Sequence, residues 1–435
     1  MTPIDPTIAM PPTGTITLPS ADVVQRFAAL WHEIVDVRGA VNMLQWDQET
    51  MMPTQGQPAR AATLATLAAL EHRLLTAPAL QDALDGVDLL AMQTEDKLLS
   101  AHVRVARREI VRATRIPERL AREMALAQSD GLMAWKTARL ESDFDRFAPR
   151  LKRLVALRRE EAAAVMPDAE PYDALLDHYE PAMTGAMLEP LFDQLRAFLT
   201  PRVQAIAERG VTIDESCALG DFPPEDQLRL SRTVAAWLGY DFDAGRLDES
   251  AHPFCIGIAT GDVRMTWRWQ PDDFRPALLG ILHELGHALY EQGLRPDLRR
   301  MPAGVSVSLG IHESQSRLWE NHVGRSHGFW RWLQPHLRKI FPMSTCDADA
   351  MWRGLHVVRP SLIRVDADQV TYNLHIALRF DLERRLFSGD LQVADLPAAW
   401  NDGMEALLGV RPKHVAEGVL QDVHWAHGMF GYFPT

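Results

Sequence analysis

The stretch LLGILHELGHALYEQGL, residues 278–294, contains the pattern His-Glu-x-x-His at His283, Glu284 and His287. Residues four apart on a helix lie on one face, so both imidazoles can reach a single metal ion, and Glu284 can contact a water molecule there. Apolar residues surround the triplet on nearly every side, which predicts a helix inside the protein. Buried histidine and glutamate need partners. A metal site provides them, and a hydrogen-bonded structural pair is the alternative.

A catalytic zinc site needs a third protein ligand and keeps its fourth position for water. The segment SVSLGIHESQSRLWENHVG, residues 306–324, is predicted to be a helix and offers Glu313, His312 and Glu320. The adjacent side chains of His312 and Glu313 point about 100° apart on a helix, so only one of them can face the metal. We expect Glu313 to be the ligand, with His312 and Glu320 as alternatives.

Composition and charge narrow the class of partner. The chain has 435 residues and a formal net charge of −13. An acidic surface repels nucleic acid and anionic membranes, so we expect no nucleic-acid or membrane partner and a small molecule or peptide instead. The sequence contains no run of about 18 uncharged apolar residues, which argues against a transmembrane helix.

The cysteines and the N-terminus bear on location and domain organisation. Cys217, Cys255 and Cys346 are widely spaced and odd in number, so we expect neither a disulfide framework nor a thiolate zinc cluster, which suits the cytoplasm. Residues 1–20 are rich in proline and threonine and lack the features of a signal peptide. We expect them to be a disordered lead, followed by one helical domain over residues 21–435.

Helical periodicity and few β-branched residues predict long amphipathic helices through most of the chain. The expected helices include residues 20–46, 60–84, 94–115, 117–139, 144–166 and 187–209. The segment 252–269, HPFCIGIATGDVRMTWRW, is the one convincing β signal and predicts a short hairpin turning at Gly261 and Asp262. Its free edge could pair with an extended peptide. The predicted fold class is therefore mostly α, with a small β-hairpin beside a groove.

Six ordered motifs together resemble the carboxypeptidase Taq family of metallocarboxypeptidases. They are His252-Pro253-Phe254, Asp262-x-Arg264-x-Thr266, HELGH at residues 283–287, His312-Glu313-Ser314-Gln315, Ile363-Arg364-x-x-Ala367-Asp368, and Gly418-x-x-Gln421-Asp422-x-His424-Trp425. Six motifs in order are far more specific than one metal signature. The resemblance covers nearly everything after the N-terminal lead.

The resemblance implies a saddle-shaped, mostly helical homodimer, related in fold to angiotensin-converting enzyme and neurolysin, with an HExxH zincin site in a deep groove. It implies an enzyme that releases single amino acids from peptides with a free C-terminus, with broad specificity but not proline. It makes His283, His287 and Glu313 the metal ligands and Glu284 the catalytic glutamate, acting as general base and then general acid. Zinc is the expected cofactor, and such a site would also accept cobalt or manganese.

The resemblance also suggests residues that contact the substrate. By similarity to the converting-enzyme fold, His424 and Tyr432 are candidate donors to the oxygen of the reacting carbonyl. The terminal carboxylate of a peptide calls for an arginine, whose planar fork binds a carboxylate through two bonds. Arg364 is the favoured anchor by its motif. Arg264 is the second choice, and a salt bridge to Asp262 is an equal alternative for it.

The sequence departs from the family at its end. Relatives usually continue beyond GYFPT, residues 431–435, so we expect the family's C-terminal helices to be missing and some apolar surface to be uncovered. The nearest alternative function is an oligopeptidase or dipeptidyl carboxypeptidase on the same scaffold. The other alternative is a catalytically idle metal-binding protein.

Overall fold

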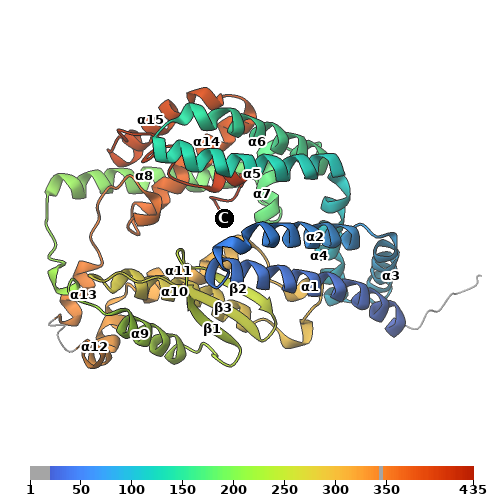
Figure 1. The fold of residues 1–435 in the computed structure, drawn as a ribbon, viewed down its shortest axis with the longest axis horizontal. Helices are drawn as coiled ribbons and strands as arrows, with labels where there is room; N and C mark the ends of the chain where they lie inside the picture. Colours follow the sequence, from blue (N-terminus) through green and yellow to red (C-terminus); the bar gives the residue numbers. More distant parts are fainter. Residues whose placement is uncertain (1–19, 342–345) are drawn as a thin grey trace, which may run out of the picture.

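The computed structural model describes residues 20–341 and 346–435. The expected disordered lead therefore lies outside the described residues, apart from Ser20, which begins the first helix, α1 (Ser20–Thr50). The described chain forms two lobes, one above the other in Figure 1, with the C-terminus lying between them. The expectation of a mostly helical fold is confirmed.

The lower lobe of Figure 1 contains nine helices and a small sheet around two hydrophobic clusters. Besides α1, its helices are α2 (Gln57–Leu75), α3 (Pro78–Thr94), α4 (Lys97–Arg115), α9 (Pro224–Trp237), α10 (Arg275–Gln292), α11 (Leu309–Arg317), α12 (His327–Ile340) and α13 (Ala348–Gly354). One cluster joins α1 to α3 and α4, and the other joins the sheet to α9, α10, α12 and α13.

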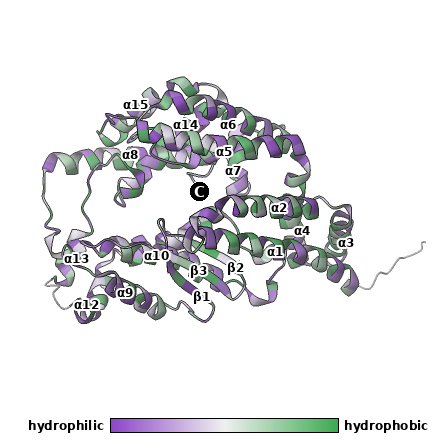
Figure 2. Ribbon diagram, in the orientation of Figure 1, coloured by the Kyte–Doolittle hydropathy of each residue, from purple (hydrophilic) through white to green (hydrophobic). Residues whose placement is uncertain are grey.

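The upper lobe packs six helices and the C-terminal segment around a single hydrophobic cluster. Its helices are α5 (Glu118–Glu141), α6 (Phe144–Val165), α7 (Pro171–Tyr179), α8 (Gly185–Arg209), α14 (Tyr372–Ser388) and α15 (Leu396–Leu408). Apolar and polar residues alternate along the helices of both lobes (Figure 2), as expected for amphipathic helices that cover a core. The chain passes between the lobes after α4, after α8 and after α13 (Figure 1).

The sheet has three strands in the order β1-β3-β2. The predicted hairpin is present as β2 (Cys255–Ala259) and β3 (Asp262–Trp267), which pair antiparallel. Strand β1 (Gly245–Glu249) was not predicted, and it pairs parallel to β3. The outer edge of β2 is not free at Gly257, whose carbonyl accepts a hydrogen bond of 2.9 Å from Asn42 of α1. The expectation of an open edge is wrong at this residue.

Two predicted helices are divided in the structure. The segment 60–84 contains the end of α2 and the start of α3, because Pro78 cannot continue the preceding helix and instead occupies the first turn of the next. The segment 306–324 consists of α11 followed by a π-helical turn, Leu318–Val323. Turns of this kind occur often at functional sites.

The structure also bears on the expectations about the cysteines and about a transmembrane helix. Cys255 is a free thiol, whereas Cys346 is disulfide-bonded, which the cysteine count did not lead us to expect. Within the described residues, no helix is long and apolar enough to cross a bilayer.

Candidate active site

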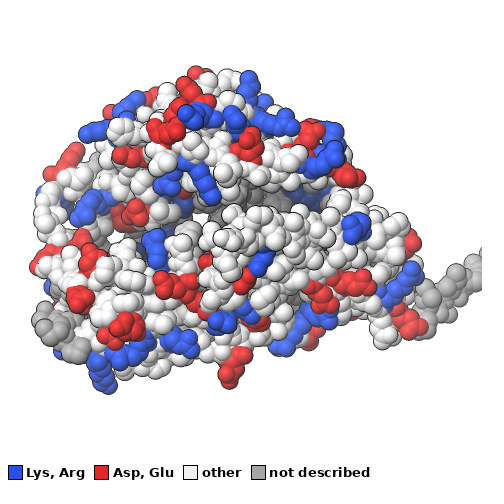
Figure 3. All heavy atoms as spheres, in the orientation of Figure 1, with Lys and Arg blue, Asp and Glu red and all other residues white. Residues whose placement is uncertain are grey.

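A cavity of about 1030 Å³ lies between the lobes and is lined from both. Figure 3 shows the surface hollowed along this line, between two faces that carry interspersed acidic and basic residues. We call one side the histidine wall; it comprises His283, Glu284, His287, Glu313 and Glu320. We call the opposite side the C-terminal wall; it comprises Arg364, Tyr372, His424, Tyr432 and Phe433.

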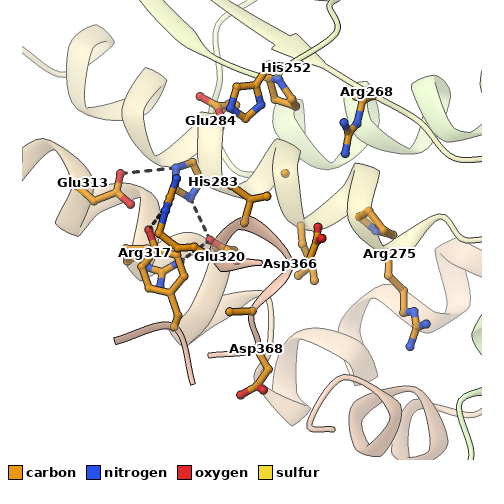
Figure 4. A pocket seen from close by; sticks show the side chains of 18 of the residues that line it. His252, Arg268, Arg275, His283, Glu284, Glu313, Arg317, Glu320, Asp366 and Asp368 are labelled. Atoms are coloured by element: carbon orange, nitrogen blue, oxygen red, sulfur yellow. Dashed lines mark hydrogen bonds and ion pairs between the residues drawn. The ribbon is translucent and has the colours of Figure 1, made fainter. Parts of the chain in front are cut away.

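The histidine wall brings His283, His287 and Glu313 together, with their ligand atoms within 4.8 Å of one another. The Nε2 atoms of His283 and His287 lie 3.5 Å and 3.3 Å from Oε2 of Glu313. Figure 4 shows Glu313 of α11 facing His283 of α10. Two imidazole nitrogens and one carboxylate are the donor set of many catalytic zinc sites, so these residues fit a divalent metal.

Each histidine of this group is oriented by a second side chain. Nδ1 of His283 lies 2.9 Å from Glu320, and Nδ1 of His287 lies 2.5 Å from Nδ1 of His312. The other ring nitrogen of His312 lies 2.8 Å from Glu291. Such partners fix the ring and leave Nε2 for the metal. His312 and Glu320, the alternative ligands from the sequence, thus lie behind the histidines.

Glu291 was missed in the sequence although a signal for it exists. It follows His287 by four residues, which places both on one face of α10. A carboxylate in that register is suited to support the site from behind. Its partner His312 comes from α11, so only the packing of the two helices reveals the pair.

A glycine allows α11 to approach α10. A Cβ atom at Gly286, inside the HELGH motif, would lie 2.3 Å from the carbonyl oxygen of Gln315 and 2.5 Å from Cα of Ser316. Ser316 in turn donates a hydrogen bond of 2.9 Å to Glu313 Oε2. The close contact of the two backbones therefore sets the position of the carboxylate of Glu313.

The electrostatics of the histidine wall favour a cation. Burial raises the pKa of Glu313, but a hydrogen bond with His287 and the charge of His283 outweigh it and lower that pKa to about 2. Burial lowers the pKa of His283, yet Glu320 and Glu313 bring it to about 9. Several carboxylates thus act on a buried cluster, where a divalent cation would offset their repulsion.

Glu284 lines the same cavity and is only 6% exposed. Burial is the main cause that raises its pKa to about 7. The charge of His283 lowers this pKa, whereas the charges of Glu313 and Glu320 raise it further. A carboxylate with this pKa can both accept and return a proton near neutral pH. Glu284 therefore has the position and the acidity of a general base.

On the C-terminal wall, Arg364 is held by Asp422 and Tyr372. Its Nε and Nη2 atoms lie 3.2 Å and 2.9 Å from Oδ1 of Asp422, and its Nη1 donates to the hydroxyl of Tyr372 at 3.2 Å. The fully buried Arg379 also binds Asp422. Burial opposes ionisation of Asp422, but Arg379 and Arg364 hold its pKa well below its ordinary value. Two arginines share one aspartate, so the group keeps one positive charge.

His424 and Tyr432 lie together on this wall, with their rings stacked at a centroid distance of 5.0 Å. Burial lowers the pKa of His424 to about 4, although Asp422 opposes the shift. Burial and the charge of Glu313 raise the pKa of Tyr432. Both side chains are therefore neutral near pH 7 and able to donate hydrogen bonds into the cavity.

A buried carboxylate that the sequence did not reveal holds this segment. Glu383 of α14 accepts hydrogen bonds from the hydroxyl of Tyr172 at 3.0 Å, from Nε1 of Trp425 at 2.6 Å and from the backbone N–H of Gly431 at 2.9 Å. Gly431 adopts φ +83°, and a Cβ there would lie 2.7 Å from the backbone of Leu176. These contacts fix the residues on either side of His424 and Tyr432.

The structure places Arg264 away from the cavity. Its Nε and Nη2 atoms each donate a hydrogen bond of 2.7 Å to the carboxylate of Asp262, and its guanidinium lies over the ring of Trp46, 4.4 Å from the ring centroid. Arg264 is absent from the residues that line the cavity, whereas Arg364 is among them. The salt-bridge alternative for Arg264 is therefore the arrangement observed.

Known proteins match this chain over most of its length. The family model "Carboxypeptidase Taq (M32) metallopeptidase" matches residues 26–435. Thermostable carboxypeptidase 1 of Thermus thermophilus is 46% identical over 90% of this chain and 79% of its own length. Thermostable carboxypeptidase 1 of Pyrococcus furiosus is 38% identical over 95% of this chain and 83% of its own length.

Solved structures of metallocarboxypeptidases have the same fold as this chain. Trypanosoma cruzi metallocarboxypeptidase 1 superposes with a TM-score of 0.90 at 36% identity, covering 95% of this chain and 83% of that one. The M32 carboxypeptidase of Deinococcus radiodurans gives the same TM-score, identity and coverage. Family match, sequence identity and fold thus agree, and the chain belongs to the carboxypeptidase Taq (M32) family of metallopeptidases.

Proposed function

We propose that the protein is a zinc-dependent carboxypeptidase that removes single amino acids from peptides with a free C-terminus. The observation that carries this proposal is the pairing of the two walls. A cluster of two histidines and a glutamate, with Glu284 beside it, faces a cavity whose opposite side presents Arg364. The metal-binding cluster with Glu284 is suited to hydrolyse an amide bond, and Arg364 is suited to select a substrate with a terminal carboxylate.

The residues that would hold the metal are His283, His287 and Glu313. When bound, a divalent zinc, cobalt or manganese ion lowers the pKa of a water molecule and stabilises negative charge on a carbonyl oxygen. Glu284 takes the proton of the attacking water and later gives it to the leaving amine. His424 and Tyr432, both neutral, donate hydrogen bonds to the carbonyl oxygen as its charge grows.

Arg364 has N–H groups left for a substrate. Its bonds to Asp422 and Tyr372 use Nε and one N–H of each terminal nitrogen. The second N–H of each terminal nitrogen can then bind a carboxylate through two parallel bonds. We assign the recognition of the free C-terminus to this end of the guanidinium, and we no longer favour Arg264 for it.

Further properties follow from the family as part of the same proposal. We expect broad specificity, with a terminal proline disfavoured because its ring replaces the N–H of the scissile amide and fixes φ. We also propose a homodimer whose residues 21–435 act as one unit, with the zincin fold of angiotensin-converting enzyme and neurolysin. The disulfide at Cys346 removes the cysteine argument for a cytoplasmic location. Sedimentation tests the dimer, and peptide pairs ending in alanine or proline test the specificity.

Mass spectrometry of products tests the function. The substrates are a benzyloxycarbonyl-blocked Ala-Arg dipeptide and an unblocked nonapeptide, with and without chelator and with zinc or cobalt restored. We expect metal-dependent release of single C-terminal residues. Dipeptides or internal fragments would point to a dipeptidyl carboxypeptidase or oligopeptidase, and no cleavage despite bound metal would point to an idle protein.

A further inference from the structure

The cavity contains an arginine that the proposed mechanism does not use. Arg268 directly follows β3 and, if the register of β2 and β3 is continued, lies opposite His252. Thr266 fixes this end of the ladder, because its hydroxyl binds the backbone N–H of Phe254 at 2.9 Å and the hydroxyl of Ser250 at 2.7 Å. Figure 4 shows the side chain of Arg268 on the side of the cavity where His252 lies, with no bond drawn to it.

The other arginines of the cavity all have acidic partners. The pairs are Arg275 with Asp273 at 2.8 Å, Arg317 with Glu320 at 3.2 Å, Arg325 with Glu320 at 3.7 Å, Arg359 with Glu215 at 3.6 Å, and Arg364 with Asp422 at 2.9 Å. Across residues 20–341 and 346–435, no ion pair or hydrogen bond is found for the side chain of Arg268. The chain has a net charge of −13, yet Arg268 is exposed in the cavity and has no acidic partner among the described residues. Its guanidinium is therefore available to an anionic ligand.

Arg268 shares its neighbourhood with a second guanidinium group, that of Arg364. Besides burial, the charges that lower the pKa of His252 are those of Arg268 and Arg364, so both guanidinium groups act on the same imidazole. Among the described residues, seven acidic side chains line the cavity. Three of them, Glu284, Glu313 and Glu320, lie on the histidine wall, and the others are Glu215, Asp273, Asp366 and Asp368. The histidine wall thus suits a cation, whereas Arg268 and Arg364 offer positive charge to an anionic group near His252.

We propose that Arg268 binds the side-chain carboxylate of acidic peptide substrates, so that peptides with glutamate or aspartate near the C-terminus are preferred. This inference rests on the proposed function, in which Arg364 holds the terminal carboxylate. A peptide has only one such terminus, and Arg364 is preorganised for it by Asp422 and Tyr372. Arg268 is exposed and unpaired, which suits a side chain that varies between substrates.

Isosteric peptide pairs test the proposal. Blocked tripeptides that carry glutamate or glutamine, at either the terminal or the penultimate position, are compared in the wild type, Arg268→Gln, Arg268→Lys and Arg359→Gln. Arg359 is the matched control, because it lines the same cavity, is 76% exposed and already has an acidic partner. We expect the glutamate-to-glutamine ratio of kcat/KM to fall about fivefold in Arg268→Gln for at least one position, and to stay unchanged in Arg359→Gln.

Arg268→Lys should keep part of the ratio, since the charge remains. The same peptide pairs are measured for binding to metal-loaded Glu284→Gln protein with and without Arg268→Gln, which gives a readout without turnover. A ratio unchanged by Arg268→Gln in both assays would overturn the proposal. So would an equal loss for all peptides with a free C-terminus, which would make Arg268 a terminal anchor. Failure of the proposed function would appear separately, as absence of cleavage by the wild type.

Discussion

The two walls of the cavity are built in different ways. The histidine wall comes from one stretch of chain, α10 to the π-helical turn, and its side chains follow helical spacing. The C-terminal wall combines Arg364 and Tyr372 with His424, Tyr432 and Phe433, and its support comes from Glu383 and, far away in sequence, Tyr172. Chemistry that depends on spacing is therefore visible in the sequence, whereas the residues of the C-terminal wall could be named only through the family's motifs, because their grouping depends on tertiary packing.

The sharpest test of the histidine wall is Glu284→Gln. Removing the general base should lower turnover by roughly 10²- to 10⁴-fold, because positioned proton transfer contributes about that much. The ligands are untouched, so the metal content should equal that of the wild type. Single-turnover kinetics and elemental analysis check both. Turnover close to the wild-type rate would remove Glu284 from its role.

The C-terminal wall can be tested through the pH dependence of stability. Burial raises the pKa of Glu383 from 4.5 to about 7, although the three hydrogen bonds that its carboxylate accepts oppose this shift. The folded state then binds this proton more tightly than the unfolded state, so the contribution to stability falls as pH rises from 4.5 to 7. The free energy of unfolding of the wild type relative to Glu383→Gln should fall by about 3 kcal/mol over this range.

Urea denaturation at several pH values measures this difference. The exposed Glu405→Gln, in the same lobe, is the control variant. A wild-type advantage over Glu383→Gln that is constant with pH would show that the carboxyl of Glu383 titrates normally. The buried network would then contribute nothing to the pH dependence.

A pair of glycines on α10 tests how the histidine wall is assembled. Gly286→Ala should destabilise the fold by about 2 kcal/mol and weaken metal binding, because the new methyl group would push α11 and Glu313 away. Gly280→Ala should stabilise by about 0.5 kcal/mol, since its Cβ meets nothing within 4 Å. Thermal unfolding and zinc titration distinguish them. Equal effects of the two variants would contradict the close packing at Gly286.

Arg364→Ala should have a smaller effect, confined to recognition. We expect KM for peptides with a free C-terminus to rise about tenfold, as a charged hydrogen-bonded pair is lost. Metal content should not change, which separates this wall from the other. Steady-state kinetics on free and amidated versions of one peptide provide the comparison. An equal loss on both versions would refute the anchor.

The sequence predicted the helical class, the β2–β3 hairpin and the shared helix face of His283 and His287, because each follows from local patterns. It left His312 and Glu320 as alternatives to Glu313 for the third ligand, and the family motif decided between them. It did not predict β1, whose sequence GRLDE has no apolar alternation and is a strand only through its pairing with β3. Local sequence also could not reveal that Asp422 is shared by Arg364 and Arg379. Such partners are set by which helices pack together.

The central claim is that the histidine wall binds a catalytic metal. The most direct measurement is the metal content of the wild type and of Glu313→Gln after incubation with zinc and extensive dialysis. We predict about one zinc ion per wild-type chain and little or none in the variant, since two histidines alone bind weakly. A wild type that retains no metal, or a variant that retains as much as the wild type, would contradict the account.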